Sequence, residues 1–141
     1  VGFSVSGSAA LLFVALLIGA GMMQSAAGNG FERVTDATDD DRERLLERQN
    51  TAIEIVAVEY NGTSGALSGR ARNDGSTGLS TEAVDLLVEG GYVDAETSVT
   101  NATTSTGLWL PGETLVANAT VASADRVKLV TGPGVADTEV R

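Results

Sequence analysis

The first thirty-one residues contain no charged side chain, and the first charge along the sequence is that of Glu32. Within this run, residues 8–27 are twenty uncharged residues that include the apolar stretch ALLFVALLI at 10–18. As a helix that rises about 1.5 Å per residue, such a segment spans roughly 30 Å, the thickness of a bilayer's hydrocarbon core. A chain of 141 residues leaves no body large enough to bury this helix on all sides. The sequence therefore predicts a single-pass transmembrane anchor over residues 1–30.

Two features of the anchor bear on its type and contacts. A cleavable secretory signal has a basic segment before its apolar core, whereas residues 1–10 contain no Lys or Arg, which favours a permanent anchor. Ala15 and Gly19, two small residues four apart, are candidates for close packing between two membrane helices. Such pairs also arise by chance in spans rich in Ala and Gly, so a chance pair is the alternative.

Three Asn-x-Thr sequons follow the anchor, at Asn61, Asn101 and Asn118. They are candidate glycosylation sites, because this tripeptide is the acceptor for N-linked glycans on exported chains. Together with the long acidic segment after the anchor, they predict that the body lies on the extracytoplasmic side of the cell membrane.

The charge balance excludes one class of partner. The net charge is −10, and Lys128 is the only lysine among nine basic residues. Nucleic acid is therefore not expected as a partner, because binding phosphates requires a surplus of Lys and Arg. Excess acid with almost no lysine favours a surface adapted to high salt over that of an ordinary acidic protein. Screening of carboxylate repulsion then predicts a melting temperature that rises between low and molar salt.

The chain contains no Cys and no His. This composition excludes disulfides, the usual zinc, haem and iron–sulfur sites, and nucleophiles that depend on Cys or His. The carboxylates are scattered through turns and a charged segment with no tuning partner beside them. The sequence therefore predicts a protein without catalytic residues, metal or cofactor.

Residues 31–52 change abruptly to the charged sequence FERVTDATDDDRERLLERQNTA. Thr38 and Asp41 resemble a capping box, and apolar residues are too few for a buried stripe. The prediction is a charged helical stalk, either continuous with the anchor or broken near Gly28–Gly30. The aspartates at 39–41 lack the spacing of a calcium loop and instead fit a solvated face.

From Ile53 onward, the hydrophobic period is two. Turn signals occur at Asn61-Gly62, at residues 73–75, where positive φ is expected, and at residues 110–113, which fit a type II turn. Strands are expected at 53–60, 66–72, 81–90, 95–100, 114–121 and 126–130. Residues 53–141 are therefore predicted to form an all-β, Ig-like sandwich.

Two further expectations concern the body's contacts. Trp109 is expected to pack inside the sandwich, with an exposed binding anchor as the alternative. The first and last expected strands, 53–60 and 126–130, are candidate binding edges, because an open edge can accept a partner strand.

Four stretches together resemble the FlaF (ArlF) family of haloarchaeal archaellum proteins. They are GFSVSGSAA near the start, RLLERQNTAIEI at the anchor–body junction, LWLPGETL before a late strand and ADRVKLVTGPGVAD near the end. The resemblance covers nearly the whole chain and lies in the combination and order of the segments. It implies a membrane anchor and an outer β-sandwich that binds the S-layer protein, forms a homodimer, and works beside a FlaG-like protein as a stator. It brings no catalytic residues.

Two rival interpretations remain. A type IV pilin-like filament subunit also has an N-terminal hydrophobic helix and a β head, but pilins usually carry Glu where Val5 stands. A tethered glycan- or solute-binding module would require a cluster of aromatic residues, and aromatic content is only 4%.

Overall fold

In the computed structural model, residues 2–100 and 106–141 are described. The chain divides into two compact units, Val1–Glu43 and Arg44–Arg141, which are treated separately below. A helix, α1 (Gly2–Asn50), extends through the first unit into the start of the second. The described strands are β1 (Ile53–Asn61), β2 (Ala66–Asn73), β3 (Leu79–Ser80), β4 (Asp85–Val88), β5 (Gly91–Val93), β6 (Glu96–Val99), β7 (Leu108–Trp109), β8 (Thr114–Thr120), β9 (Arg126–Val130) and β10 (Ala136–Val140), with a 3₁₀ turn at Thr81–Ala83.

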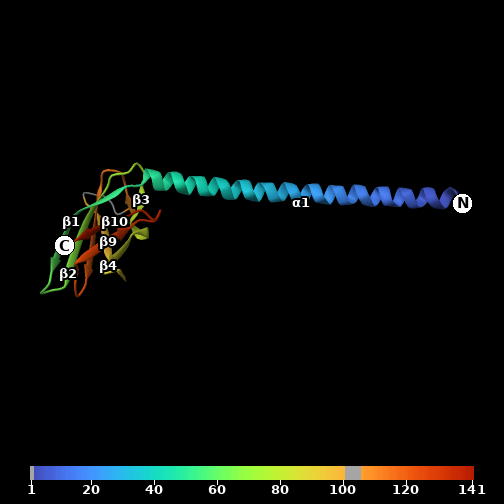
Figure 1. The fold of residues 1–141 in the computed structure, drawn as a ribbon. Helices are drawn as coiled ribbons and strands as arrows, with labels where there is room; N and C mark the ends of the chain where they lie inside the picture. The colour runs from blue at the N-terminus through green and yellow to red at the C-terminus, as the bar shows by residue number, and fades with distance from the viewer. Residues whose placement is uncertain (1, 101–105) are drawn as a thin grey trace. The chain divides into compact units, whose positions relative to one another are not determined.

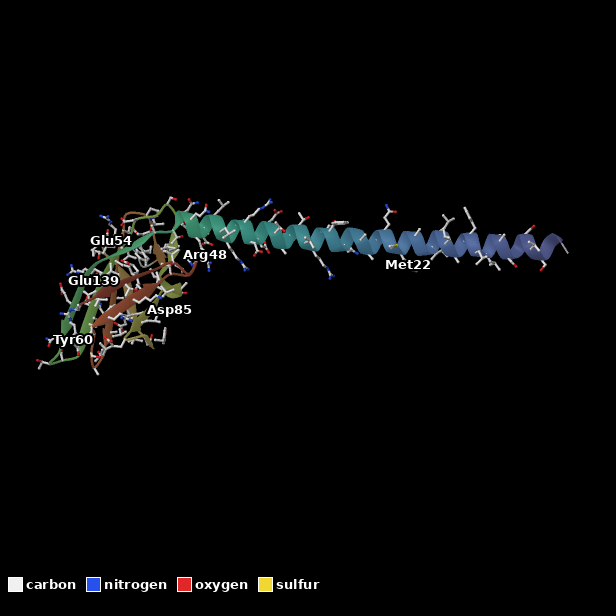
Figure 2. All side chains as sticks on the ribbon, viewed as in Figure 1. Met22, Arg48, Glu54, Tyr60, Asp85 and Glu139 are labelled. Carbon is white, nitrogen blue, oxygen red and sulfur yellow. The ribbon has the colours of Figure 1, made fainter. Side chains whose placement is uncertain are left out.

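The apolar part of α1 packs against no other element of its unit. An 18-residue window of the helix has a mean hydropathy of 2.1 with none of it buried, so α1 is long and apolar enough to cross a membrane. Figure 2 shows side chains, Met22 among them, projecting from all sides of the helix. Gly28–Gly30 lie within α1, which Figure 1 draws unbroken, so of the two alternatives the helix is continuous.

The capping box expected at Thr38 is not formed. Thr38 lies inside α1, where its hydroxyl donates to the Val34 carbonyl at 2.8 Å. A helix that continues from the preceding apolar segment needs no new N-cap, and an interior Thr satisfies its hydroxyl on the preceding turn. Nearby, Arg42 and Asp39 form an exposed ion pair at 3.8 Å.

The body consists of antiparallel sheets, in an arrangement consistent with a β-sandwich. One four-stranded sheet has the order β1-β2-β8-β6, the other has the order β10-β9-β4-β5, and β3 pairs with β7. Alternate residues of β2 and β8 point inward, so that Leu67 and Ala71 join Leu115 and Ala117 in the core. The other sheet contributes Leu86, Val88, Val127 and Leu129 to the same cluster.

Most expected strands are confirmed to within a residue or two, and the exceptions are instructive. The segment 81–90 is not one strand but the 3₁₀ turn, the short β4 and a turn at Glu89-Gly90. The strand β10 was not expected, because only one of its residues is even half buried and no apolar alternation marks it. It forms because β9 offers it a complete antiparallel ladder.

The expectation that residues 126–130 form an edge was wrong. This strand, β9, pairs on one side with β10 and on the other with β4, so it is an interior strand. The first strand, β1, is an edge, but its Ile55 amide donates to the Asp137 carboxylate of β10 at 2.8 Å. A charged side chain that accepts the hydrogen bond of an edge amide makes that edge less able to pair with an additional strand.

Two turns had different outcomes. The type II turn is confirmed, because the Glu113 amide donates to the Leu110 carbonyl at 3.1 Å and Gly112 has φ of 84°. At residues 73–75 no residue has positive φ, so that expectation was wrong. Glycine is required at 75 by close packing instead, since an added Cβ would lie 2.6 Å from the Ala52 nitrogen and closer still to the Asn50 carbonyl oxygen.

Candidate functional site

The end of α1 is hydrogen-bonded into the body. Arg48 Nε donates to the Pro133 carbonyl at 2.8 Å, in the loop between β9 and β10. Thr51, directly after the helix, is buried, and its hydroxyl donates to the Glu47 carbonyl at 2.6 Å. The last turn of α1 therefore belongs structurally to the body, as does the whole segment from Arg44.

The loop after β2 forms the second half of this junction. The amides of Asp74 and Gly75 both donate to the Ala52 carbonyl, at 2.8 and 3.0 Å, and the Ser76 amide donates to the Asn50 carbonyl at 2.8 Å. The Asn50 bond satisfies one of the carbonyls that a helix C-terminus leaves without an intrahelical partner. We refer to Arg48, Asn50, Ala52, Gly75 and Pro133 together as the junction.

A buried asparagine holds that loop in place. Asn73 is almost fully buried, and its Nδ2 donates to the carbonyls of Thr77 and Trp109 at 2.9 and 3.1 Å. Its Oδ1 accepts from the Gly75 amide at 3.1 Å. Trp109 is itself buried, which confirms its expected position, and its Nε1 donates to the Glu113 carbonyl at 2.8 Å. Asn73 and Trp109 thus connect the junction to the core, and both side chains form hydrogen bonds there.

The outer face of the sheet β1-β2-β8-β6 is polar and its arginines are paired. Arg70 forms an ion pair with Glu59, and Arg72 pairs with Asp74 and, at 3.5 Å, with Glu54. The hydrogen bond from Arg72 lowers the pKa of the Asp74 carboxyl below its ordinary value, and Asp74 in turn raises the pKa of Arg72. Both groups are exposed, so this pair adds little stability.

Two of the three sequon asparagines lie on this same face. Asn61, at the end of β1, accepts hydrogen bonds at Oδ1 from the amides of Thr63 and Ser64, at 3.0 and 3.3 Å. Asn118 is exposed within β8, opposite Ser68 of β2 and Glu96 of β6. Asn101 lies outside the described residues.

Asn61 and Asn118 border one shallow hollow of about 920 Å³. Three carboxylates, from Glu59, Asp94 and Glu96, also line it. No group of three or more acidic residues in the described ranges is placed to hold a metal ion. The hollow is therefore an acidic surface with two possible points of glycan attachment.

The outer face of the sheet β10-β9-β4-β5 also carries charges of both signs. Arg126 and Lys128 of β9 lie on the same side as Asp85 of β4, and the Glu89 carboxylate accepts the Arg126 amide at 2.8 Å. Neither Arg126 nor Lys128 forms an ion pair with any residue that the structure describes. Tyr92 and Val140, on the two edge strands, are 69% and 64% exposed.

The remaining candidates lie on the helix. Ala15 and Gly19 are both exposed on α1, and an added Cβ at Gly19 would meet nothing within 4 Å. Helix packing at this pair stays a prediction. The sequence placed the anchor–body junction at the segment RLLERQNTAIEI but did not predict its contacts with Gly75 and Pro133. It marked Asn73-Asp74-Gly75 as a turn, with a different reason for the glycine.

Comparison with known proteins finds similarity among solved structures alone. No protein-family model matches the chain, and no curated protein matches it. Among solved structures, the chain is similar to the archaellum periplasmic stator protein FlaG from Sulfolobus acidocaldarius, with 17% sequence identity and a TM-score of 0.47 over 64% of this chain and 99% of that chain. Values this low establish neither fold nor function, so the proposal below rests on the residues of this chain.

Proposed function

We propose that the protein is a membrane-anchored, non-enzymatic component of the archaellum motor, whose extracytoplasmic body binds S-layer protein and acts as a stator. The body lies on the outer, pseudo-periplasmic side, as an Ig-like sandwich carried on the charged stalk of residues 31–52. The resemblance of four ordered segments to the FlaF family supports this assignment, and it also implies a FlaG-like partner and a homodimer.

The observation that carries the proposal is the junction. A stator transmits force between a membrane anchor and a fixed wall, so the connection between anchor and head has to resist bending. The helix that contains the apolar span ends in the body, where the carbonyls of Asn50 and Ala52 accept amide hydrogen bonds and Arg48 donates to Pro133. A flexible tether, of the kind that suits a solute-binding module, would instead be rich in Gly, Ser or Pro at this point.

The central test uses the full chain in nanodiscs and purified S-layer protein in molar salt. The proposal expects saturable binding, together with loss of swimming on deletion of the gene while filaments still assemble. Swimming by the deletion strain would contradict the stator role. Filaments built from the protein itself would instead favour the pilin-like alternative.

Sidedness is tested separately on intact cells. The proposal expects added protease to cleave the body, and mass spectrometry to find a glycan on at least one of Asn61, Asn101 and Asn118. Protection of the body in intact cells would reverse the topology, while unmodified peptides at all three positions would remove only the glycosylation.

A further inference from the structure

The structure describes two of the three sequons, and their backbones differ. The sequon of Asn61 runs from the end of β1 into the turn at residues 62–65, whereas the sequon of Asn118 lies wholly within β8. Both asparagines are exposed, and neither Nδ2 donates a hydrogen bond to any residue that the structure describes. Exposure of the side chain therefore does not distinguish the two sites, and the backbone does.

The side chain of Asn61 itself bends its sequon. Asn61 Oδ1 accepts from the Thr63 amide at 3.0 Å, which closes an Asx turn between the first and third residues of the sequon. The Gly65 amide donates to the Asn61 carbonyl at 2.7 Å, and Gly65 adopts a φ of 73° that suits glycine. This turn occupies the carboxamide oxygen and leaves Nδ2, the atom that carries an N-linked glycan, without an internal partner.

The sequon of Asn118 is instead extended and paired on both sides. Asn118 lies opposite Ser68 of β2 and Glu96 of β6, and the next residue, Ala119, packs against the core. A transferase has to enclose the residues around its acceptor, which is why acceptor sequons lie in surface loops. Bending β8 would break both ladders, and interior strands open with free energies that approach that of global unfolding. The folded body therefore withholds Asn118.

We propose that Asn61 is a site of N-glycosylation and that Asn118 stays unmodified once the body has folded. In the transfer, Asn61 Nδ2 bonds to the anomeric carbon of a lipid-phosphate-linked glycan as the bond from that carbon to the phosphate oxygen breaks. The lipid phosphate leaves with the bonding electron pair, and one amide proton passes to a base of the transferase. This inference rests on the outer location of the body under the proposed function and adds which sequon is used.

The position of Asn61 determines what its glycan would cover. The strand β1 runs from Ile53, just after α1, to Asn61, and its nine residues extend about 26 Å at roughly 3.3 Å per step. Figure 2 labels Arg48 and Tyr60, the neighbour of Asn61, at opposite ends of the body. A glycan at Asn61 would therefore stand beside the acidic hollow, at the end of the body far from the junction.

The test measures site occupancy in full-length protein purified from membranes of the native host. Trypsin separates the two sites, because Asn61 falls in the peptide of residues 49–70 and Asn118 in that of residues 73–126. Asn101 shares the second peptide, so the comparison is made in the Asn101→Gln variant. Intact glycopeptides should give an occupancy at Asn61 at least about tenfold above that at Asn118, because opening β8 is costly.

Two matched variants confirm the assignment. Thr63→Val removes the acceptor hydroxyl but keeps the amide that closes the turn, and it should abolish the glycan at Asn61. Thr120→Val makes the same change at an exposed position of the other sequon and should leave the intact mass of the glycoprotein otherwise unchanged. A glycan mass that persisted in full in Thr63→Val would place the modification elsewhere and overturn the inference.

Other outcomes separate this inference from the proposed function. Occupancy at Asn118 equal to or above that at Asn61 would show that the turn does not select the site, while the outer location of the body would stand. An unmodified Asn61 would overturn the inference alone if added protease still cleaved the body on intact cells. An unmodified Asn61 in a body protected from protease would overturn both.

Discussion

Leucine occupies two opposite environments in the two units of this protein. In α1, the leucines at 11, 12, 16 and 17 are 57–74% exposed, whereas those of the body core, at 67, 79, 86, 115 and 129, are at most 3% exposed. The body therefore buries the leucines of its core internally. The helix has no such partner among the residues of its own unit that the structure describes.

The free energy gained by burying leucine is large enough to indicate that the apolar part of α1 requires an apolar environment. Burying a leucine contributes roughly 1.5–3 kcal/mol relative to leaving it in water. Four leucines in the uncharged part of this helix thus forgo a free energy comparable to the net stability of a small domain. This contrast indicates that the body folds in water, whereas the start of α1 suits an apolar environment.

The largest expected effect tests the body side of this comparison. Leu115→Ala should lower the free energy of unfolding by about 2–5 kcal/mol, because Leu115 is fully buried and a cavity would remain. The thermal midpoint would then fall by roughly 10 °C or more. Leu16→Ala is the matched control and should leave the transition of the body unchanged. An equal loss in both variants, measured by circular dichroism, would show that α1 buries its leucines after all.

A charge in the middle of α1 tests the helix side. Leu16→Arg should oppose membrane insertion by about 2.5–3.5 kcal/mol, the cost of arginine at the centre of a span. The measurement is the fraction of full-length protein that remains in the membrane after extraction with alkaline carbonate. Leu45→Arg, in the charged part of the same helix, should not change that fraction. Equal retention of all three proteins would argue against a membrane span at residues 8–27.

The next prediction concerns the place where helix and body meet. Gly75→Ala should destabilise the body by about 1–3 kcal/mol, because the new methyl group would press on the backbone of Asn50 and Ala52. Gly78→Ala is the control, since its Cβ would lie 3.5 Å from Leu110 Cδ2, an ordinary contact. Hydrogen exchange at residues 74–76 should accelerate in the first variant alone. Unchanged exchange at residues 74–76 in Gly75→Ala would mean that the junction accommodates the methyl group and keeps its hydrogen bonds.

The smallest effect is a pH dependence on the surface of the body. Because Arg72 holds the pKa of Asp74 below its ordinary value of 3.8, the pair stabilises the folded state above that pH and loses this contribution as the pH falls through the lowered pKa. Asp74→Asn should therefore reduce the thermal midpoint slightly at pH 7, and by less as the pH falls below the ordinary pKa of the carboxyl. Arg72→Gln should reproduce this pH-dependent loss of thermal midpoint, since it removes the guanidinium that lowers the pKa of Asp74. A difference that stayed constant as the pH was lowered would assign the effect to something other than the charge of Asp74.

The sequence alone determined the features that depend on neighbouring residues. The uncharged run predicted an apolar helix, the alternation after Ile53 predicted short strands, and Leu110–Glu113 specified a type II turn. Each is local, because the pattern and the structure it produces lie within one or two turns of chain.

Tertiary structure decided which strands pair and what becomes buried. The strand β10 has no pattern of its own and exists because β9 pairs with it, which turned an expected edge into an interior strand. Likewise Gly75 meets the end of α1, and Lys128 lies beside Leu87, only after segments far apart in the chain come together. Such contacts depend on how the two sheets close around one core, and no local period in the sequence encodes that closure.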